Sequence, residues 1–280
     1  IPPAEPILFY LVQTNISHFS SKRLKEILDK DMVAANPNAE RSVGILQCGE
    51  VPESLSHAFI DYNEMIAKSL VAADPTLTCR TWRVFEGEIP EPDECDAWIT
   101  TGSRHSVNDE NHWTEQFCDF VKVAAEKEHP FVGICYGMQM MARALGGRVE
   151  FSQKGWGVGV ATSSVYEQPA WMSQAVDELN LVVSHQEQVI TLPENATLVA
   201  GSDFCPHSIF SVGQSMLGIQ GHPEFTTEYS RALMEARREI IPADRVSEGM
   251  DSLAKPVHGG LTFEWIVKFI REALSRSAAS

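Results

Sequence analysis

Residues 131–147 read FVGICYGMQMMARALGG, and this stretch decides the fold. A short apolar run ends just before Cys135, and a helical pattern starts behind it. Its apolar positions follow the i, i+3, i+4, i+7 spacing of one helix face: Met138, Met141, Ala142 and Leu145. Gly146-Gly147 is a natural stop for such a helix. The stretch therefore predicts a strand, a sharp turn and a helix, with Cys135 at the turn.

Cys135 is a candidate nucleophile because of this position. A residue at a strand-to-helix turn commonly has a strained backbone and an exposed side chain, as in the nucleophile elbow of hydrolases. The unpaired N–H groups and the dipole of the following helix favour a thiolate there. Taken alone, the motif fits a buried structural cysteine equally well.

The chain around this stretch predicts an α/β fold with a mostly parallel central sheet between layers of helices. Between residues 41 and 147 buried strand-like runs alternate with helical patterns, which is typical of parallel sheets. The strands are expected at 42–48, 77–84, 97–100 and 131–134, and the helices at 55–73 and 112–127.

After residue 147 short β-like runs separated by turns indicate a smaller antiparallel portion. A helix is expected at 226–241, a Pro/Gly-bearing loop at 242–260 and a helix at 261–274. We expect residues 1–40 to be an N-terminal extension and residues 41–280 to form the main domain.

Composition excludes some classes of partner. The 280 residues include 22 Lys and Arg against 38 Asp and Glu, a net charge of −16, which argues against nucleic acid and anionic membranes as partners. No apolar run approaches the ~20 residues needed to span a bilayer. Six cysteines without a C-x-x-C pair favour a reducing compartment, and we expect a cytoplasmic protein.

A base for the cysteine is offered by His222-Pro223-Glu224. In extended backbone residues two apart point the same way, so Glu224 could orient the His222 ring. A thiolate–imidazolium pair with Cys135 would result, stabilised by the carboxylate. By itself the tripeptide is also compatible with a solvent-facing turn.

An oxyanion formed at Cys135 needs hydrogen-bond donors. The N–H of Tyr136 directly follows the cysteine, and a second donor could come from Gly102 or Ser103, at the end of the neighbouring predicted strand. An ordinary βα turn would explain the Gly102 segment as well.

Together, residues 133–139, Gly146-Gly147 and residues 221–224 resemble the class I glutamine amidotransferase family. The likeness covers roughly residues 41–240 and is greatest to the glutaminase domain of GMP synthase and its stand-alone relatives. The resemblance implies a flavodoxin-like fold, with Cys135 as nucleophile, His222 as general base and acid, and Glu224 as orienting carboxylate. It implies neither a metal nor a cofactor.

The resemblance also assigns the remaining site residues. The oxyanion hole would be formed by Gly102 or Ser103 with Tyr136, and Gln139 would help to seat the substrate. A second substrate-side segment consists of Ser184, His185, Gln186 and Glu187. The family usually has Gly-Gly-Pro at Gly102-Ser103-Arg104 and Gly-Asp at Gln186-Glu187. No ATP-pyrophosphatase domain follows in this sequence, so we do not expect a complete GMP synthase.

Three functions remain open on the sequence. The first is a glutamine amidotransferase that releases ammonia from glutamine, with a synthase or acceptor as a possible partner. The second is a γ-glutamyl peptidase acting on glutathione-like conjugates, whose Ser-His-Gln segment this chain resembles. The third is a non-catalytic member of the fold, against which the intact triad argues. A partner surface would favour the first, and a wide pocket above Cys135 the second.

Overall fold

The protein is described by a computed structural model, which covers residues 40–277. The predicted N-terminal extension, residues 1–40, lies outside the described residues apart from Glu40. The division of the chain at residues 40 and 41 therefore stays a prediction, and the elements described below belong to the main domain.

The centre of this domain is a nine-stranded sheet with the order β2-β1-β3-β4-β11-β10-β9-β6-β7. The first five strands of this order pair in parallel: β2 Leu77–Arg83, β1 Arg41–Gln47, β3 Ala97–Thr100, β4 Phe131–Ile134 and β11 Met216–Ile219. Every residue of β3, β4 and β11 is buried, as expected of parallel strands that are covered on both faces. The predicted mostly parallel core is confirmed.

The antiparallel portion continues the same sheet. It consists of β10 Ile209–Val212, β9 Ala196–Gly201, β6 Gly157–Val165 and β7 Glu178–His185. After β7 the chain turns at Gln186 into β8 (Glu187–Thr191), which pairs with β5 (Arg148–Phe151) in a separate two-stranded sheet. The predicted substrate segment thus lies where the chain passes from one sheet to the other.

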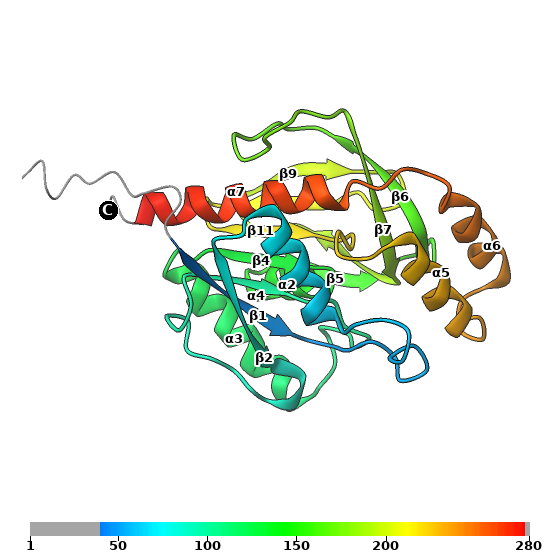
Figure 1. Cartoon of the computed structure of the whole chain (residues 1–280), viewed down its shortest axis with the longest axis horizontal. Helices are drawn as coiled ribbons and strands as arrows, with labels where there is room; N and C mark the ends of the chain where they lie inside the picture. Colours follow the sequence, from blue (N-terminus) through cyan, green and yellow to red (C-terminus); the bar gives the residue numbers. More distant parts are fainter. Residues whose placement is uncertain (1–39, 278–280) are drawn as a thin grey trace, which may run out of the picture. The chain divides into compact units, whose positions relative to one another are not determined.

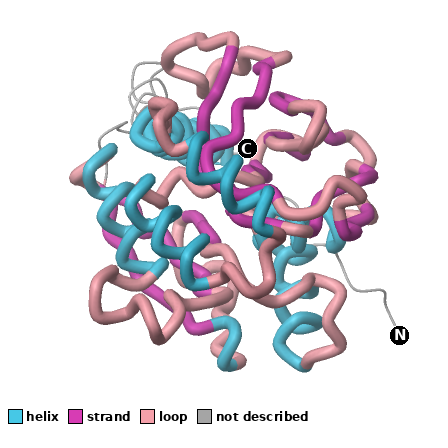
Figure 2. The backbone as a smooth tube through the Cα atoms, turned by 90° about the vertical axis from the view of Figure 1, so that its right-hand side faces the viewer, coloured by secondary structure: helices cyan, strands magenta, loops and turns pink. Residues whose placement is uncertain are grey.

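Helices cover both faces of the parallel strands, which gives the expected three layers (Figures 1 and 2). One face carries α2 (Tyr62–Ala73) and α7 (Gly259–Ser277), and the other carries α3 (His112–Glu126) and α4 (Tyr136–Ala144). Strand β1 shows how the sequence produces this arrangement. Val43 and Ile45 contact the first layer and Leu46 contacts the second, because successive side chains of a strand alternate in direction.

The expectation of a loop at 242–260 is wrong, because this segment contains helix α6 (Ala243–Ser252). Figure 1 shows α6 beside α5 (Thr227–Ala236) at one end of the sheet, and both helices pack on β6. The segment carries few large apolar residues and lies between Pro242 and Gly259-Gly260, and these features favoured a loop. Gly249 contacts Val158 and Met234 closely, since a Cβ there would lie 2.6 Å from the Met234 sulfur. Tertiary packing therefore determines this helix.

The helix expected at 55–73 begins only at Tyr62. Asp61 ends the preceding loop by capping the helix: its carboxylate accepts hydrogen bonds from the first turn, and Glu64 accepts one from the Asp61 N–H (3.1 Å). This reciprocal pair is a capping box, which satisfies N–H groups that a helix start leaves unpaired. A helix starting at residue 55 would forgo these bonds.

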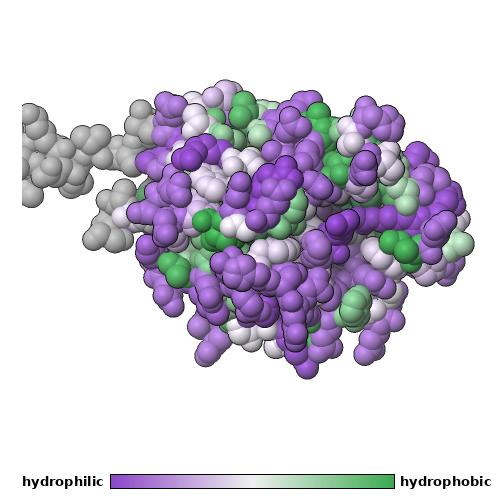
Figure 3. Space-filling view, turned by 90° about the horizontal axis from the view of Figure 1, so that it is seen from below, coloured by the Kyte–Doolittle hydropathy of each residue, from purple (hydrophilic) through white to green (hydrophobic). Residues whose placement is uncertain are grey.

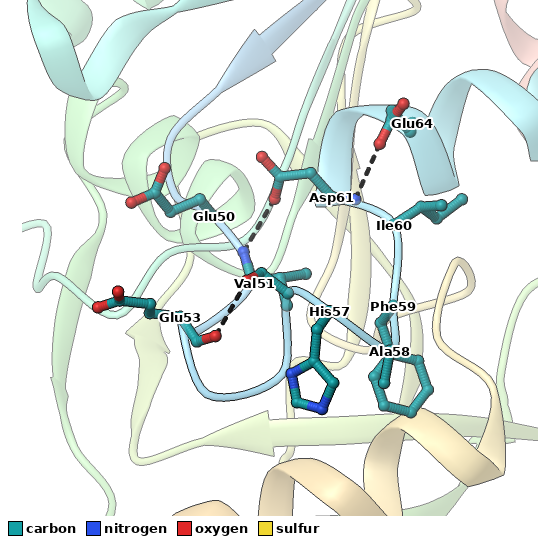
Figure 4. Close-up of a pocket in the computed structure, with 10 residues that line it drawn as sticks. Glu50, Val51, Glu53, His57, Ala58, Phe59, Ile60, Asp61 and Glu64 are labelled. Carbon is teal, nitrogen blue, oxygen red and sulfur yellow. Dashed lines mark hydrogen bonds between the residues drawn. The ribbon is translucent and has the colours of Figure 1, made fainter.

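Asp61 also joins the loop to the end of β1. Its Oδ1 accepts from the Val51 N–H (2.8 Å), and its Oδ2 accepts from the buried Gln47 amide (2.8 Å). Figure 4 shows Asp61 between Val51 and Glu64, above a cavity of about 610 Å³ that residues 50–64 line. One carboxylate therefore fixes the path of the chain from the sheet into α2.

The surface seen in Figure 3 is largely hydrophilic, with apolar residues scattered rather than gathered into a continuous patch. Within residues 40–277 no helix is both long and apolar enough to cross a membrane.

We expect Asp61→Ala to lower the free energy of unfolding by about 2 kcal/mol, because it removes a helix cap and leaves the Gln47 amide without this acceptor. Urea denaturation monitored by circular dichroism measures the change. Asp203→Ala, an exposed aspartate, serves as control and should shift stability by less than about 0.5 kcal/mol. Equal effects of the two substitutions would contradict this role of Asp61.

Candidate active site

Three neighbouring parallel strands bring the predicted catalytic segments together. In the order β3-β4-β11, the carboxyl ends lead into Gly102, Cys135 and His222 respectively. The Cys135 N–H donates to the carbonyl of Ile219, the last residue of β11 (2.8 Å). Ligand sites of open α/β sheets form at this edge. Strand pairing thus brings together Cys135 and His222, which are 87 positions apart in the sequence.

Cys135 has the strained backbone expected of an elbow, with φ 49° and ψ −98°. The turn is tight because α4 begins directly against β3. A Cβ on Gly137 would lie 1.9 Å from the Thr100 hydroxyl oxygen, so only glycine fits there. That hydroxyl also accepts from the Ile134 N–H (2.9 Å). The exposed side chain expected at the elbow is not found: Cys135 is 4% exposed and lies in the wall of a cavity.

His222 and Glu224 form a buried pair. The Nδ1 of His222 lies 2.8 Å from Oε1 of Glu224, and the two side chains are 4% and 0% exposed. The Phe225 ring stacks on the imidazole at 4.1 Å, and the His222 N–H donates to the Val182 carbonyl (2.7 Å). The stacking on Phe225 and the contact with Glu224 orient the ring, while the bond to Val182, which the main-chain N–H donates, fixes the backbone. The expected orienting geometry is therefore present.

The pKa of His222 is raised. Burial alone would lower it, but the Glu224 carboxylate and the neighbouring Cys135, which shares a side-chain hydrogen bond with the ring, outweigh burial. A raised pKa means that the imidazolium form is stable in this site. The site therefore holds the positive charge of His222 next to the Cys135 sulfur at neutral pH.

Gln220 completes this cluster and was not singled out by the sequence analysis. Its Nε2 lies 3.4 Å from the Cys135 sulfur, and its Oε1 accepts from Gln139 Nε2 (3.2 Å). Gln139 Nε2 also donates to the Glu187 carbonyl (2.9 Å). The sequence contained one signal that could have identified Gln220, which is a polar residue directly after the apolar strand β11. Gln139 is thus linked to the nucleophile through Gln220, and its seating of a substrate stays a prediction.

The residues expected to form the oxyanion hole lie around the same point. A Cβ on Gly102 would lie 2.5 Å from the His222 ring, so the loop after β3 passes directly over the imidazole. Ser103 lines the Cys135 cavity. The Tyr136 side chain packs away from it, between Trp113 and Phe117, so only its main-chain N–H could contribute. As the first residue of α4, Tyr136 has no intrahelical acceptor for that N–H.

The cavity above Cys135 has a volume of about 560 Å³. Its lining includes all of the predicted substrate residues: Gln139, Ser184, His185, Gln186 and Glu187. It also includes residues that the sequence analysis did not predict there: Phe151, Trp156, Arg237 and Ile240. Phe151 and Ile240 are 64% and 62% exposed, so they give the cavity an apolar outer wall.

The substrate segment is held by its own hydrogen bonds. His185 Nδ1 lies 3.1 Å from the Glu187 carbonyl and donates to it, and the Ser106 hydroxyl donates to the Glu187 carboxylate (2.7 Å). Burial lowers the pKa of His185 to about 4, so the ring is neutral. Burial raises the pKa of Glu187. The His185 ring therefore shapes the turn, and substrate contacts by this segment stay predictions.

Between residues 40 and 277 there is no cluster of three His, Cys, Asp or Glu side chains that could hold a metal ion. The acidic cavity of residues 50–64 shares no lining residue with the Cys135 cavity. A cysteine at a strained elbow beside a buried His–Glu pair is the arrangement that acyl transfer by a thiol requires.

We expect stability to rise with pH between about 4 and 6.5 because of His185. In this window the unfolded chain binds a proton to the histidine that the folded protein excludes, and the difference amounts to about 3 kcal/mol. Thermal unfolding measured from pH 4 to 7 should show a shallower slope for His185→Gln. His57→Gln, in the loop of the other cavity, is the control. Parallel slopes for His185→Gln and the unsubstituted protein would contradict the neutral buried ring.

The sequences of known proteins indicate the family to which this chain is related. Gamma-glutamyl peptidase 4 of Arabidopsis thaliana is 30% identical over 156 residues, which cover 53% of this chain and 62% of the peptidase. The GMP synthase [glutamine-hydrolyzing] of Bacillus subtilis is 36% identical over 140 residues, 49% of this chain and 26% of the synthase. The chain thus spans less than two thirds of the length of either relative.

A solved structure has the same fold. The glutamine amido transferase of Methylobacillus flagellatus superposes with a TM-score of 0.63, covering 85% of this chain and 96% of that protein at 18% identity. The family model described as glutamine amidotransferase class-I matches residues 57–238, which include the elbow, the His222-Pro223-Glu224 segment and the turn after β7. The chain belongs to the class I glutamine amidotransferase family.

Proposed function

We propose that this protein hydrolyses γ-glutamyl amide bonds, with Cys135 as nucleophile, His222 as general base and acid, and Glu224 as the orienting carboxylate. The observation that carries the proposal is a strained elbow cysteine in the wall of a cavity, joined by a side-chain hydrogen bond to the ring of a buried His–Glu pair whose Nδ1 and Oε1 atoms lie 2.8 Å apart. Family membership supports the same chemistry.

In the first half-reaction the Cys135 thiolate attacks the γ-carbonyl carbon, and the negative charge moves to the carbonyl oxygen. The main-chain N–H groups of Tyr136 and of Gly102 or Ser103 stabilise this oxyanion. The C–N bond then breaks, and the His222 imidazolium gives its proton to the departing nitrogen. The products are a γ-glutamyl thioester and a free amine.

In the second half-reaction His222, now neutral, takes a proton from water while the water oxygen attacks the thioester carbon. Collapse of the intermediate breaks the C–S bond, releases glutamate and restores the thiolate–imidazolium pair. Glu224 stays ionised throughout and stabilises the imidazolium, as the carboxylate of a catalytic triad does.

The leaving group we propose is an amine larger than ammonia, which makes the protein a γ-glutamyl peptidase. A cavity of about 560 Å³ lies in the ~300–1,000 Å³ range of sites that enclose whole small-molecule ligands. Its apolar outer wall suits an organic group. Similarity to the Arabidopsis peptidase supports this choice over free glutamine, the first reading of the sequence.

Glutamine remains the second candidate substrate, which the similarity to the Bacillus subtilis GMP synthase favours. In that case ammonia would pass to a synthase or acceptor partner. The net charge of −16 makes nucleic acid and anionic membranes unsuitable partners. All six cysteines are free, which supports a reducing, cytoplasmic location.

We expect Cys135→Ala to abolish hydrolysis while the fold is kept. The pure protein is incubated with glutamine, γ-glutamyl-p-nitroanilide and γ-glutamyl peptides, and glutamate release is measured. Circular dichroism confirms folding, and Cys118→Ala, a buried cysteine of α3 outside the site, is the control that should retain activity. Turnover by the Cys135→Ala protein would disprove the scheme, and turnover of glutamine alone would exclude the peptidase assignment.

We expect Glu224→Gln to lower kcat by about 10³-fold or more, because the amide neither stabilises the imidazolium nor fixes the tautomer. The His222 pKa should fall, so the thiolate should form only at higher pH. The rate of Cys135 alkylation by iodoacetamide, followed against pH, measures this shift directly. An unchanged alkylation profile would refute the role of Glu224.

A further inference from the structure

Arg237 lies in the wall of the Cys135 cavity and has no role in the chemistry above. It directly follows α5, the helix that begins just after His222-Pro223-Glu224. Its Nη1 donates to the Ser184 hydroxyl (3.0 Å), and no carboxylate of residues 40–277 forms an ion pair with it. Of the nearby arginines, Arg238 pairs with Glu235 and Arg245 pairs with Glu248, whereas Arg231 contacts the Met250 sulfur.

An unpaired arginine is unusual in this position. A guanidinium stays charged at any physiological pH, and partial burial without a counter-ion costs free energy. The chain carries a net charge of −16, so carboxylates are plentiful, yet none is placed opposite Arg237. Ser184 occupies one donor of a group that has five, which leaves a fork suited to a planar anion such as a carboxylate.

The position of Arg237 indicates which part of a substrate it meets. Ser184 is two residues from Val182, whose carbonyl accepts from the His222 N–H, so Ser184 and Arg237 lie on the His222 side of the cavity. Electrostatics agrees: burial raises the pKa of Tyr62 to about 12, and this tyrosine senses the charges of both Arg237 and Glu224.

The leaving group departs on the His222 side, because His222 must reach the nitrogen that it protonates. We propose that Arg237, positioned by Ser184, binds a carboxylate of the leaving group, so that the preferred substrates are γ-glutamyl peptides whose released amine is an amino acid or short peptide with a free carboxylate. This inference rests on the proposed function and names the substrate class of the same site.

The positive charge of Arg237 in the cavity has a physical role in this chain. A protein of net charge −16 repels anionic substrates, and a cation in the cavity offsets this repulsion where the substrate binds. Arg104 is a second cavity cation without an ion-pair partner among residues 40–277. It follows Ser103, on the segment after β3, and is therefore the rival that an experiment must separate from Arg237.

Binding to the Cys135→Ala protein tests the inference without turnover. Isothermal titration calorimetry compares γ-glutamyl-alanine and γ-glutamyl-alanyl-glycine, each with its own C-terminal amide. We expect the acid of at least one pair to bind about tenfold more tightly than its amide. Arg237→Gln should reduce this ratio to about 1, and Arg237→Lys should leave it intermediate because the charge is kept but the fork is lost. Arg238→Gln, the adjacent ion-paired arginine, should leave the ratio unchanged.

Three outcomes would overturn the inference: an acid-to-amide ratio near 1 with Arg237 present, a ratio that survives Arg237→Gln, or a ratio that only Arg104→Gln abolishes. A merely structural role would weaken acid and amide equally and so leave the ratio in place. Hydrolysis of γ-glutamyl-p-nitroanilide, whose leaving group has no carboxylate, is measured separately with the active protein. Its absence would count against the proposed function, whereas the ratio alone decides the role of Arg237.

Discussion

The pairing of β4 with β3 on one side and β11 on the other is the constraint on which the site depends. Because these three strands are parallel, their carboxyl ends deliver Gly102, Cys135 and the His222 segment to one edge. The close approach of Gly137 to Thr100 then fixes where α4 starts, and with it the strained turn at Cys135. Backbone geometry rather than its own side-chain contacts therefore places Cys135, the nucleophile that we propose.

The buried charges at this edge of the sheet serve the proposed chemistry and lower the stability of the fold. A carboxylate that is 0% exposed, as in Glu224, costs several kcal/mol unless a charge faces it, and buried ion pairs recover this cost only in part. Here the counter-charge is the His222 imidazolium, whose pKa both Glu224 and the neighbouring Cys135 raise. The amides of Gln139 and Gln220 extend this network to the turn after β7, so the nucleophile and the substrate segment are joined by hydrogen bonds.

Much of the fold and of the candidate site could be predicted from the sequence. The elbow, the His222-Pro223-Glu224 segment and the order of strands and helices depend on local patterns, and the structure has them where they were expected. The errors have different causes. The start of α2 is set by the capping box of Asp61 and Glu64, a local pattern that was overlooked in favour of the apolar residues before it. Helix α6 depends on packing against β6, a contact between distant residues that no local pattern predicts.

Short motifs and apolar periodicity were enough to predict the family and the α/β fold from the sequence, and they led to the triad that we propose. The tertiary structure was needed to show that Cys135 is buried in a cavity wall, that Gln220 contacts its sulfur, and that Arg237 lies beside Ser184 without a carboxylate partner among residues 40–277. Strand β7 lies beside the segment that follows β11, and the main-chain N–H of His222 joins the two by donating to the Val182 carbonyl. A contact between residues 40 positions apart is set by the packing of the whole sheet, so no local pattern could reveal it.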